Sequence, residues 1–150
     1  MLRPQMNLTA AETSTGTAAC RSQPRIRAVI ADDEKLARAT ITMLLKSQNA
    51  IELVGSASTG PEAVTVVRRM EPDLLFLDVD MPGLSGFEVL ERIPEDRRPA
   101  VIFTTADKAH APKAFDVEAL DYLLKPFTRA RFQLALKRAR ARLRPELVRI

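Results

Sequence analysis

Two carboxylates stand at the end of an apolar run, in the stretch LLFLDVDMPG. Asp78 closes the run and Asp80 follows two residues later. Carboxylates are rarely buried in a strand without a partner that neutralises them. A second acidic pair, Asp32-Asp33, follows another short apolar run, IRAVIA. The residue types and their positions therefore indicate acids that act together on a cation or on a charged substrate.

Short apolar segments rich in β-branched residues alternate along the chain with segments of helical periodicity. We expect strands at residues 26–31, 51–57, 73–78, 100–105 and 119–124. We expect helices after residue 33, after residue 59, at 86–93, at about 111–117 and from about 128 to 143. Serial βα units predict an α/β fold, a (βα)5 doubly wound parallel sheet with the flavodoxin-like strand order 2-1-3-4-5.

In such a sheet, ligands bind at the carboxyl ends of the strands, near the switch in strand order. The first strand ends at Asp32-Asp33 and the third at Asp78, while Thr105 ends the fourth and Lys125 follows the fifth. Three clustered carboxylates need compensation, and Mg²⁺ suits them because it accepts a few carboxylates and keeps several waters. This set predicts phosphoryl transfer with Asp78 as the nucleophile and an aspartyl phosphate as the product.

Four separated motifs at these positions resemble the receiver domains of two-component response regulators. They are ADDE after the first strand, FLDVDMPGLSG at the third, FTTA at the fourth and DYLLKPF at the fifth. The resemblance implies that Asp78 is the phosphoacceptor in a phosphorelay. It also implies that Asp33, Asp78 and the backbone carbonyl of Asp80 bind Mg²⁺, and that Asp32 acts nearby or through a water.

The same resemblance assigns roles to residues around the acidic cluster. It implies that Thr105 binds the phosphoryl oxygen, that Lys125 pairs with it, and that Tyr122 is the switch aromatic. Asp80 and Asp107 would flank the path of the attacking water. We expect these two acids to repel incoming anions and to tune the lifetime of the phosphate. Apart from its own phosphorylation and dephosphorylation, the chain is not expected to act as an enzyme.

Two backbone features are expected near the site. The Lys125-Pro126 bond is typically cis in the resembled family, a form that essentially only X-Pro bonds reach at low cost, and it would aim Lys125 at the site. Gly83 and Gly86 would let the loop after Asp78 turn sharply.

The stretch FTTADKAHAPKAFDVEALDYLLKPF resembles the LytR/AlgR-type subfamily. That resemblance implies transcription regulation through a C-terminal DNA-binding domain that this chain lacks, so DNA would be bound only through the missing output. The implied phosphoryl donor is a cognate sensor histidine kinase or a phosphotransfer protein. The usual partner face in the family combines the fourth helix, the fifth strand and the fifth helix. We expect Leu134 to contribute to this face, through which a homodimer would form.

Composition limits the location and organisation of the protein. No apolar run approaches the ~20 residues of a membrane helix, and the only cysteine, Cys20, allows no internal disulfide. A cytoplasmic location without membrane partners is therefore expected. Residues 1–25 are interpreted as a disordered extension, 26–143 as the receiver domain and 144–150 as a linker stub or tail. The only histidine, His110, is expected at the surface.

Several alternatives compete with the receiver interpretation. Asp32-Asp33 alone could cap a helix, and Asp78-Val-Asp80 also resembles the nucleophile motif of haloacid-dehalogenase-type phosphatases. The segment 126–150 holds eight basic residues and one acid, but the polar face of its helix, with Arg129, Lys137 and Arg140, lacks the interleaved aromatic residues and the groove-reading motif of a nucleic-acid surface. A stand-alone or degenerate receiver that works only by protein–protein interaction is the remaining alternative.

Overall fold

The strands of this protein are short apolar segments that form one parallel sheet. A computed structural model describes residues 25–145. The strands run in chain order as β1 (Ile26–Ala31), β2 (Ile51–Ala57), β3 (Leu74–Asp78), β4 (Ala100–Thr105) and β5 (Asp121–Leu124). Their spatial order is β2-β1-β3-β4-β5, and each neighbouring pair is parallel. The predicted flavodoxin-like order is therefore confirmed.

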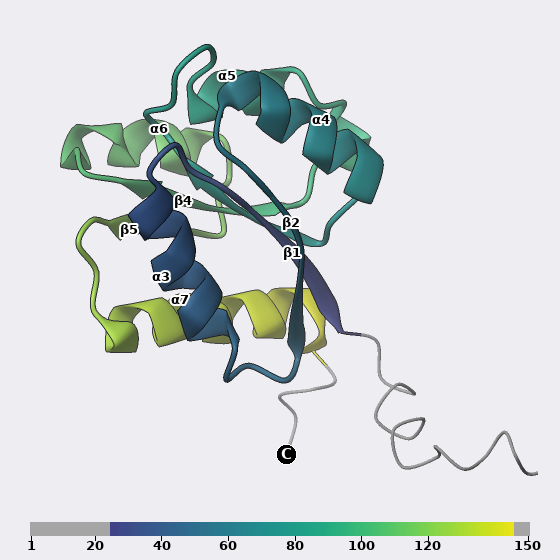
Figure 1. Cartoon of the computed structure of the whole chain (residues 1–150), viewed down its shortest axis with the longest axis vertical. Coiled ribbons are helices and arrows are strands. Elements are labelled where there is room, and N and C mark those ends of the chain that lie inside the picture. The colour runs from purple at the N-terminus through teal and green to yellow at the C-terminus, as the bar shows by residue number, and fades with distance from the viewer. Residues whose placement is uncertain (1–24, 146–150) are drawn as a thin grey trace, which may run out of the picture.

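Helices cover both faces of this sheet (Figure 1). The α-helices of the described chain are α3 (Lys35–Leu45), α4 (Gly60–Met70), α5 (Gly86–Glu91), α6 (Ala111–Asp116) and α7 (Arg129–Leu143), with short 3-10 helices η1 (Glu95–Arg97) and η2 (Lys108–His110). Helices α4, α5 and α6 lie on one face, and α3 and α7 lie on the other. Because the helices cover the two faces, a site can form at the carboxyl ends of the strands, where the βα loops begin.

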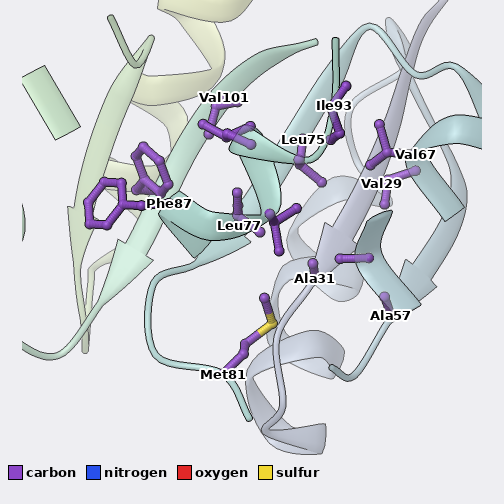
Figure 2. Packing of buried hydrophobic residues seen from close by; sticks show 14 of the residues in the cluster. Val29, Ala31, Ala57, Val67, Leu75, Leu77, Met81, Phe87, Ile93 and Val101 are labelled. Carbon is purple, nitrogen blue, oxygen red and sulfur yellow. The ribbon is translucent and has the colours of Figure 1, made fainter. Parts of the chain in front are cut away.

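Each face of the sheet buries its own apolar cluster. On the first face, Val29 of β1 and Leu75 and Leu77 of β3 pack with Val67 of α4 and Phe87 of α5 (Figure 2). On the second face, the buried residues of α3 and α7 pack on the opposite sides of the same strands. Those helix residues are Ile41, Leu44, Leu45, Phe132, Ala135, Leu136 and Ala139. The central strands are buried on both sides, which explains their nearly continuous apolar sequence.

The helix starts follow from local capping chemistry. The Thr59 hydroxyl accepts a hydrogen bond from the Glu62 N–H at 3.2 Å, as the spacing of these residues predicts. The Glu62 carboxylate, however, accepts from the Ser58 N–H at 2.7 Å rather than from Thr59. A complete capping box forms instead at α5, between Ser85 and Glu88. It fixes the start of the helix that follows the Asp78 loop.

Some element boundaries differ from the predicted ones. Strand β3 begins at Leu74, one residue later than predicted, and the Asp73 carboxylate before it accepts the Arg27 N–H at 2.9 Å. Strand β5 begins at Asp121, two residues later than predicted. The expected disordered extension and tail fall mostly on residues 1–24 and 146–150, which lie outside the described residues. Within residues 25–145, no helix is long and apolar enough to cross a membrane.

Candidate functional site

Three carboxylates meet at the carboxyl ends of β1 and β3, the two strands at the switch in strand order. Carboxylate oxygens of Asp32, Asp33 and Asp78 all lie within 4.8 Å of one another. Asp32 and Asp78 are 1% and 3% exposed, whereas Asp33 faces solvent. The sequence predicted this convergence from the strand order, and the structure confirms the geometry.

Lys125 is the cation that faces this cluster. Its Nζ atom lies 2.9 Å from Asp32 Oδ2 and 3.7 Å from Asp78 Oδ2. Burial by itself would lower the pKa of Lys125, but hydrogen bonds to Asp32 and Glu34 outweigh it and raise the pKa. Lys125 therefore stays charged beside the acids. The Lys125-Pro126 bond that follows is cis, as the resemblance implied.

The Asp78 carboxyl is difficult to ionise in this setting. Burial and, next, the charge of Asp32 raise the pKa of Asp78 to about 7, although Lys125 and the Asp80 N–H oppose this. The Asp80 N–H lies 3.3 Å from Asp78 Oδ1. A further positive charge at the cluster would favour the ionised, nucleophilic form of Asp78.

Thr105 ends β4 next to the acidic cluster and is fully buried. Its predecessor Thr104 pairs with Asp78 in the sheet. The Thr105 hydroxyl donates to Asp80 Oδ2 at 3.1 Å and accepts the N–H of Asp107 at 3.1 Å. The Thr105 hydroxyl thus lies at the carboxyl end of β4, as the strand positions predicted, and the Asp80 side chain binds it.

Tyr122 and Asp107 join β5 to the loop after β4. The Tyr122 hydroxyl donates to the backbone carbonyl of Asp107 at 2.7 Å. Burial and the nearby charges of Asp107 and Asp80 raise the pKa of Tyr122. The Asp107 carboxylate accepts from the Ala109 N–H at 2.9 Å and caps η2. Asp107 therefore shapes the loop through its side chain, a role that the sequence interpretation did not include.

The loop between Asp78 and α5 depends on its glycines. Gly83 has a φ of +88°, a region that L-residues rarely adopt. At Gly86, a Cβ atom would lie 2.6 Å from the backbone oxygen of Asp78. The Gly86 N–H also donates to the carbonyl of Val79 at 2.9 Å. The prediction of a tight loop is confirmed, and Gly86 contributes through close approach rather than through an unusual φ.

Two residues at the site make contacts that the sequence interpretation did not include. Glu34 places Oε1 3.0 Å from Lys125 Nζ, although it could have been suspected from its position directly after Asp32-Asp33. His110, expected at the surface, has a side chain only 28% exposed, and its Nε2 lies 3.3 Å from Asp80 Oδ1. His110 thus keeps partial contact with solvent, as expected, but its contact with Asp80 was not predicted from the sequence.

Leu134 lies on α7, away from the acidic cluster. Its side chain is 41% exposed. Other exposed apolar side chains occur on α6 and β5, where Phe115 is 84% and Leu124 is 41% exposed. The predicted face of the fourth helix, fifth strand and fifth helix thus presents apolar groups on each of its elements, here α6, β5 and α7.

Comparison with known proteins identifies the class of this fold and site. Residues 28–137 match the response regulator receiver domain family. The response regulatory domain of protein mrkE from Klebsiella pneumoniae aligns with a TM-score of 0.73 and 29% identity, covering 80% of this chain and 99% of that one. The signal receiver domain of the response regulator NarL from Mycobacterium tuberculosis aligns with a TM-score of 0.69 and 28% identity, covering 78% of this chain and 98% of that one. The chain belongs to the receiver domains of two-component response regulators.

Sequence relatives narrow the class to the LytR/AlgR type. The transcriptional regulatory protein BtsR of Escherichia coli is 43% identical over 115 residues, covering 77% of this chain and 48% of the relative. The sensory transduction protein LytT of Bacillus subtilis is 43% identical over 114 residues, covering 75% and 47%. This chain thus spans about half the length of these relatives. The family match favours a receiver over the phosphatase considered from the Asp78-Val-Asp80 motif.

Proposed function

We propose that this receiver accepts a phosphoryl group on Asp78 from the phosphohistidine of a partner kinase or phosphotransfer protein. The observation that carries the proposal is the convergence of Asp32, Asp33 and Asp78 within 4.8 Å, with Lys125 Nζ 3.7 Å from the acceptor carboxylate. A purely structural cluster of three acids would be costly, because like charges at this spacing raise one another's pKa values.

The residues present fit a magnesium ion. Asp32, Asp33 and Asp78 place carboxylate oxygens within 4.8 Å of one another, and Lys125 Nζ, 2.9 Å from Asp32 Oδ2, supplies only one positive charge to the three acids. Hard oxygen ligands of this kind suit Mg²⁺. Asp33, Asp78 and the backbone carbonyl of Asp80 would hold the ion, with Asp32 acting through a water. When bound, Mg²⁺ would supply positive charge that neutralises the carboxylates and the phosphoryl oxygens.

The chain's own groups would then direct an in-line transfer. An Asp78 carboxylate oxygen forms a bond to phosphorus while the bond from phosphorus to the donor's imidazole nitrogen breaks, and that nitrogen leaves with the bonding electron pair. Lys125 would pair with one phosphoryl oxygen, and the Thr105 hydroxyl would donate to another. Tyr122 is hydrogen-bonded to Asp107 in the loop after β4, so a change in that loop would alter the position of Tyr122 and thereby the partner face.

The same groups would control removal of the phosphoryl group. We assign lifetime tuning to Asp80 and Asp107, which carry negative charge on either side of Thr105. These charges would hinder an approaching anion and alter hydrolysis. An unchanged phosphate lifetime in the variant Asp80→Asn, Asp107→Ala would exclude this role. In this proposal the chain catalyses only its own phosphorylation and dephosphorylation.

The receiver would also need protein partners and an output domain. The relative BtsR, of which the match covers 48%, is named a transcriptional regulatory protein, so we propose that a DNA-binding output, outside this chain, receives the signal. The face of α6, β5 and α7 would be the switched surface, with Leu134 contributing to a homodimer. A cytoplasmic location follows, because the sensor kinase domains that supply phosphohistidine use cytoplasmic ATP.

The test is intact-mass spectrometry after incubation with Mg²⁺ and a small acyl-phosphate donor. The wild-type protein is expected to gain one phosphoryl group, and Asp78→Asn is expected to gain none. Chelation of Mg²⁺ should prevent the adduct. If neither protein gains mass, the cluster is not a competent acceptor and the chain works by protein–protein interaction alone.

A further inference from the structure

The Asp80 side chain connects two segments that are distant in sequence. Asp80 lies in the loop after β3, and one of its carboxylate oxygens, Oδ2, accepts from the Thr105 hydroxyl at 3.1 Å. The other, Oδ1, lies 3.3 Å from His110 Nε2 at the end of η2. One carboxylate thus bridges the end of β4 and the residue that directly precedes α6.

The Thr105 hydroxyl has no free hydrogen to donate in this arrangement. A hydroxyl carries one hydrogen to donate and two lone pairs to accept. Thr105 Oγ1 already accepts the N–H of Asp107 at 3.1 Å, and its single hydrogen points to Asp80. Thr105 therefore cannot donate to a phosphoryl oxygen on Asp78 until it gives up Asp80. Phosphorylation must exchange one acceptor for the other.

His110 is held in place from a second side. Its ring meets the edge of Phe87 with a centroid distance of 6.0 Å, and Phe87 packs on Phe103 at 4.8 Å. Phe87 belongs to α5, whose preceding loop contains Asp80. The imidazole is thus seated between α5 and η2 with its Nε2 directed at Asp80. By contrast, the Asp80 side chain is 62% exposed and has room to move.

We propose that the Asp80 carboxylate is a displaceable stand-in for the phosphoryl group at Thr105, and that His110 is the positioning residue that holds it there. This inference rests on the proposed function and deepens it. When Asp78 is phosphorylated, Thr105 turns its hydrogen to a phosphoryl oxygen and Asp80 keeps only His110. The link between β4 and the start of α6 through Asp80 is then broken. Asp80 and His110 thereby couple the acceptor site to the α6 end of the partner face.

The charge repulsion proposed above for Asp80 and Asp107 concerns the hydrolysis of the phosphoryl group. If repulsion by Asp80 also governed binding of the incoming anion, it would be a competing explanation for the effect of Asp80 on binding. Two substitutions separate the two explanations. Asp80→Ala removes both the charge and the acceptor for Thr105, whereas Asp80→Asn removes the charge but keeps an amide oxygen that can accept. Displacement predicts that the alanine variant differs from wild type and that the asparagine variant stays close to it. Repulsion predicts that both variants change equally.

The measurement is the affinity for beryllofluoride, a phosphoryl mimic, in the presence of Mg²⁺. Tyr122 is the only tyrosine and the chain has no tryptophan, so tyrosine fluorescence reports on this loop alone. Asp80→Ala is expected to bind beryllofluoride about three- to tenfold more tightly than wild type, because the hydrogen bond between Thr105 and Asp80 no longer has to be broken. Equal tightening in Asp80→Asn, or no tightening in Asp80→Ala, would overturn the inference.

The role of His110 is tested by rescue and by coupling. His110→Ala should tighten binding in the same direction as Asp80→Ala, whereas His110→Gln, which keeps a donor for Asp80, should stay near wild type. In the double variant Asp80→Ala, His110→Ala, the second substitution should add nothing. Additive effects would mean that His110 acts through packing on Phe87 and would contradict the positioning role.

Two controls keep the result interpretable. Urea unfolding of each variant checks that the fold is retained. We expect the Asp80 variants to fold, because the Asp80 side chain is exposed. Wild-type phosphorylation by the acyl-phosphate donor is measured in parallel. If the wild type gains no phosphoryl group and binds no beryllofluoride, the proposed function fails and this inference fails with it. If the wild type reacts but the variants all match it, only the stand-in role of Asp80 fails.

Discussion

The Asp121 carboxylate at the start of β5 is held by the Arg131 guanidinium of α7 through hydrogen bonds of 2.7 and 3.1 Å. Arg138 contacts the same carboxylate at 3.0 Å, and the Asp121 side chain is only 6% exposed. Because β5 is an edge strand with one sheet neighbour, this ion pair joins it to the helix that follows. The loop that carries Lys125 is therefore anchored at both of its ends.

Replacement of Asp121 by asparagine is expected to destabilise the fold by about 1.5–3 kcal/mol at pH 7, the range for hydrogen bonds to charged groups. Burial alone would raise the pKa of Asp121, but hydrogen bonds from Arg131 and from the Tyr122 N–H outweigh it and lower the pKa below its ordinary 3.8. A carboxyl with a lower pKa in the folded state adds stability above its unfolded pKa and loses it as the pH falls through the folded pKa.

The difference in unfolding free energy between wild type and Asp121→Asn should therefore be full above about pH 4 and shrink in more acidic solution. Urea titrations at neutral and acidic pH measure it. Glu52→Gln on β2 is the matched control, because that carboxylate is exposed, and its effect should stay within about 0.5 kcal/mol. A difference that is independent of pH would show that Asp121 acts through shape rather than charge.

Phe132 on α7 is expected to carry much of the packing on its face of the sheet. The side chain is fully buried, and its ring stacks on Phe76 at 5.6 Å and on Phe127 at 5.8 Å between centroids. Phe132→Ala should destabilise the protein by about 3–5 kcal/mol, because lost transfer energy and a residual cavity add. The control Phe115→Ala removes a ring that is 84% exposed and should change stability by about 0.5 kcal/mol or less. Chemical denaturation compares the two, and similar losses would contradict this ranking.

The strands and the acidic cluster are predictable from the sequence because both depend on strong local patterns. Strands β1, β2 and β4 match their predicted ranges, since each is a short apolar run with β-branched residues. The cluster then follows from topology, because parallel strands place Asp32 and Asp78 at the same edge. Neither inference needs knowledge of a side-chain conformation.

The partners of these side chains are not predictable in the same way. Glu34 and Lys125 are 91 residues apart, and Asp80 and His110 are 30 residues apart. Their contacts depend on loop conformations and side-chain rotamers, which no periodicity encodes. Ala119 and Leu120 are apolar and were therefore included in the predicted strand. Nothing in the sequence indicated that β5 begins only at Asp121, where the ion pair to Arg131 forms.

Leu134 provides a test of the proposed partner face. Its side chain is 41% exposed on α7, so Leu134→Glu should leave stability nearly unchanged while a buried carboxylate disfavours any contact made there. We expect weaker self-association of the phosphorylated or beryllofluoride-bound form by sedimentation velocity. Leu36→Glu is the matched control, because Leu36 is 79% exposed but lies on α3. If Leu134→Glu and wild type associate equally, Leu134 is not part of a dimer contact.

Magnesium should stabilise the folded protein through the acidic cluster. A ligand that binds only the folded state at tenfold excess over its Kd adds about 1.4 kcal/mol to the free energy of unfolding. Asp33→Asn should abolish most of this gain, because the proposed site loses a direct ligand, yet slightly raise the stability without metal, because repulsion near Asp78 falls. Thermal unfolding with Mg²⁺ and with a chelator measures both effects.

The opposite signs of these two effects distinguish a metal site from general damage. Glu52→Gln removes one exposed carboxylate on β2 and should keep the full magnesium response. A variant that merely disturbed the β1–α3 loop would instead lose stability under both conditions. If Mg²⁺ stabilises Asp33→Asn as much as wild type, then Asp33 is not a ligand and the ion, if bound, depends on Asp32 and Asp78 alone.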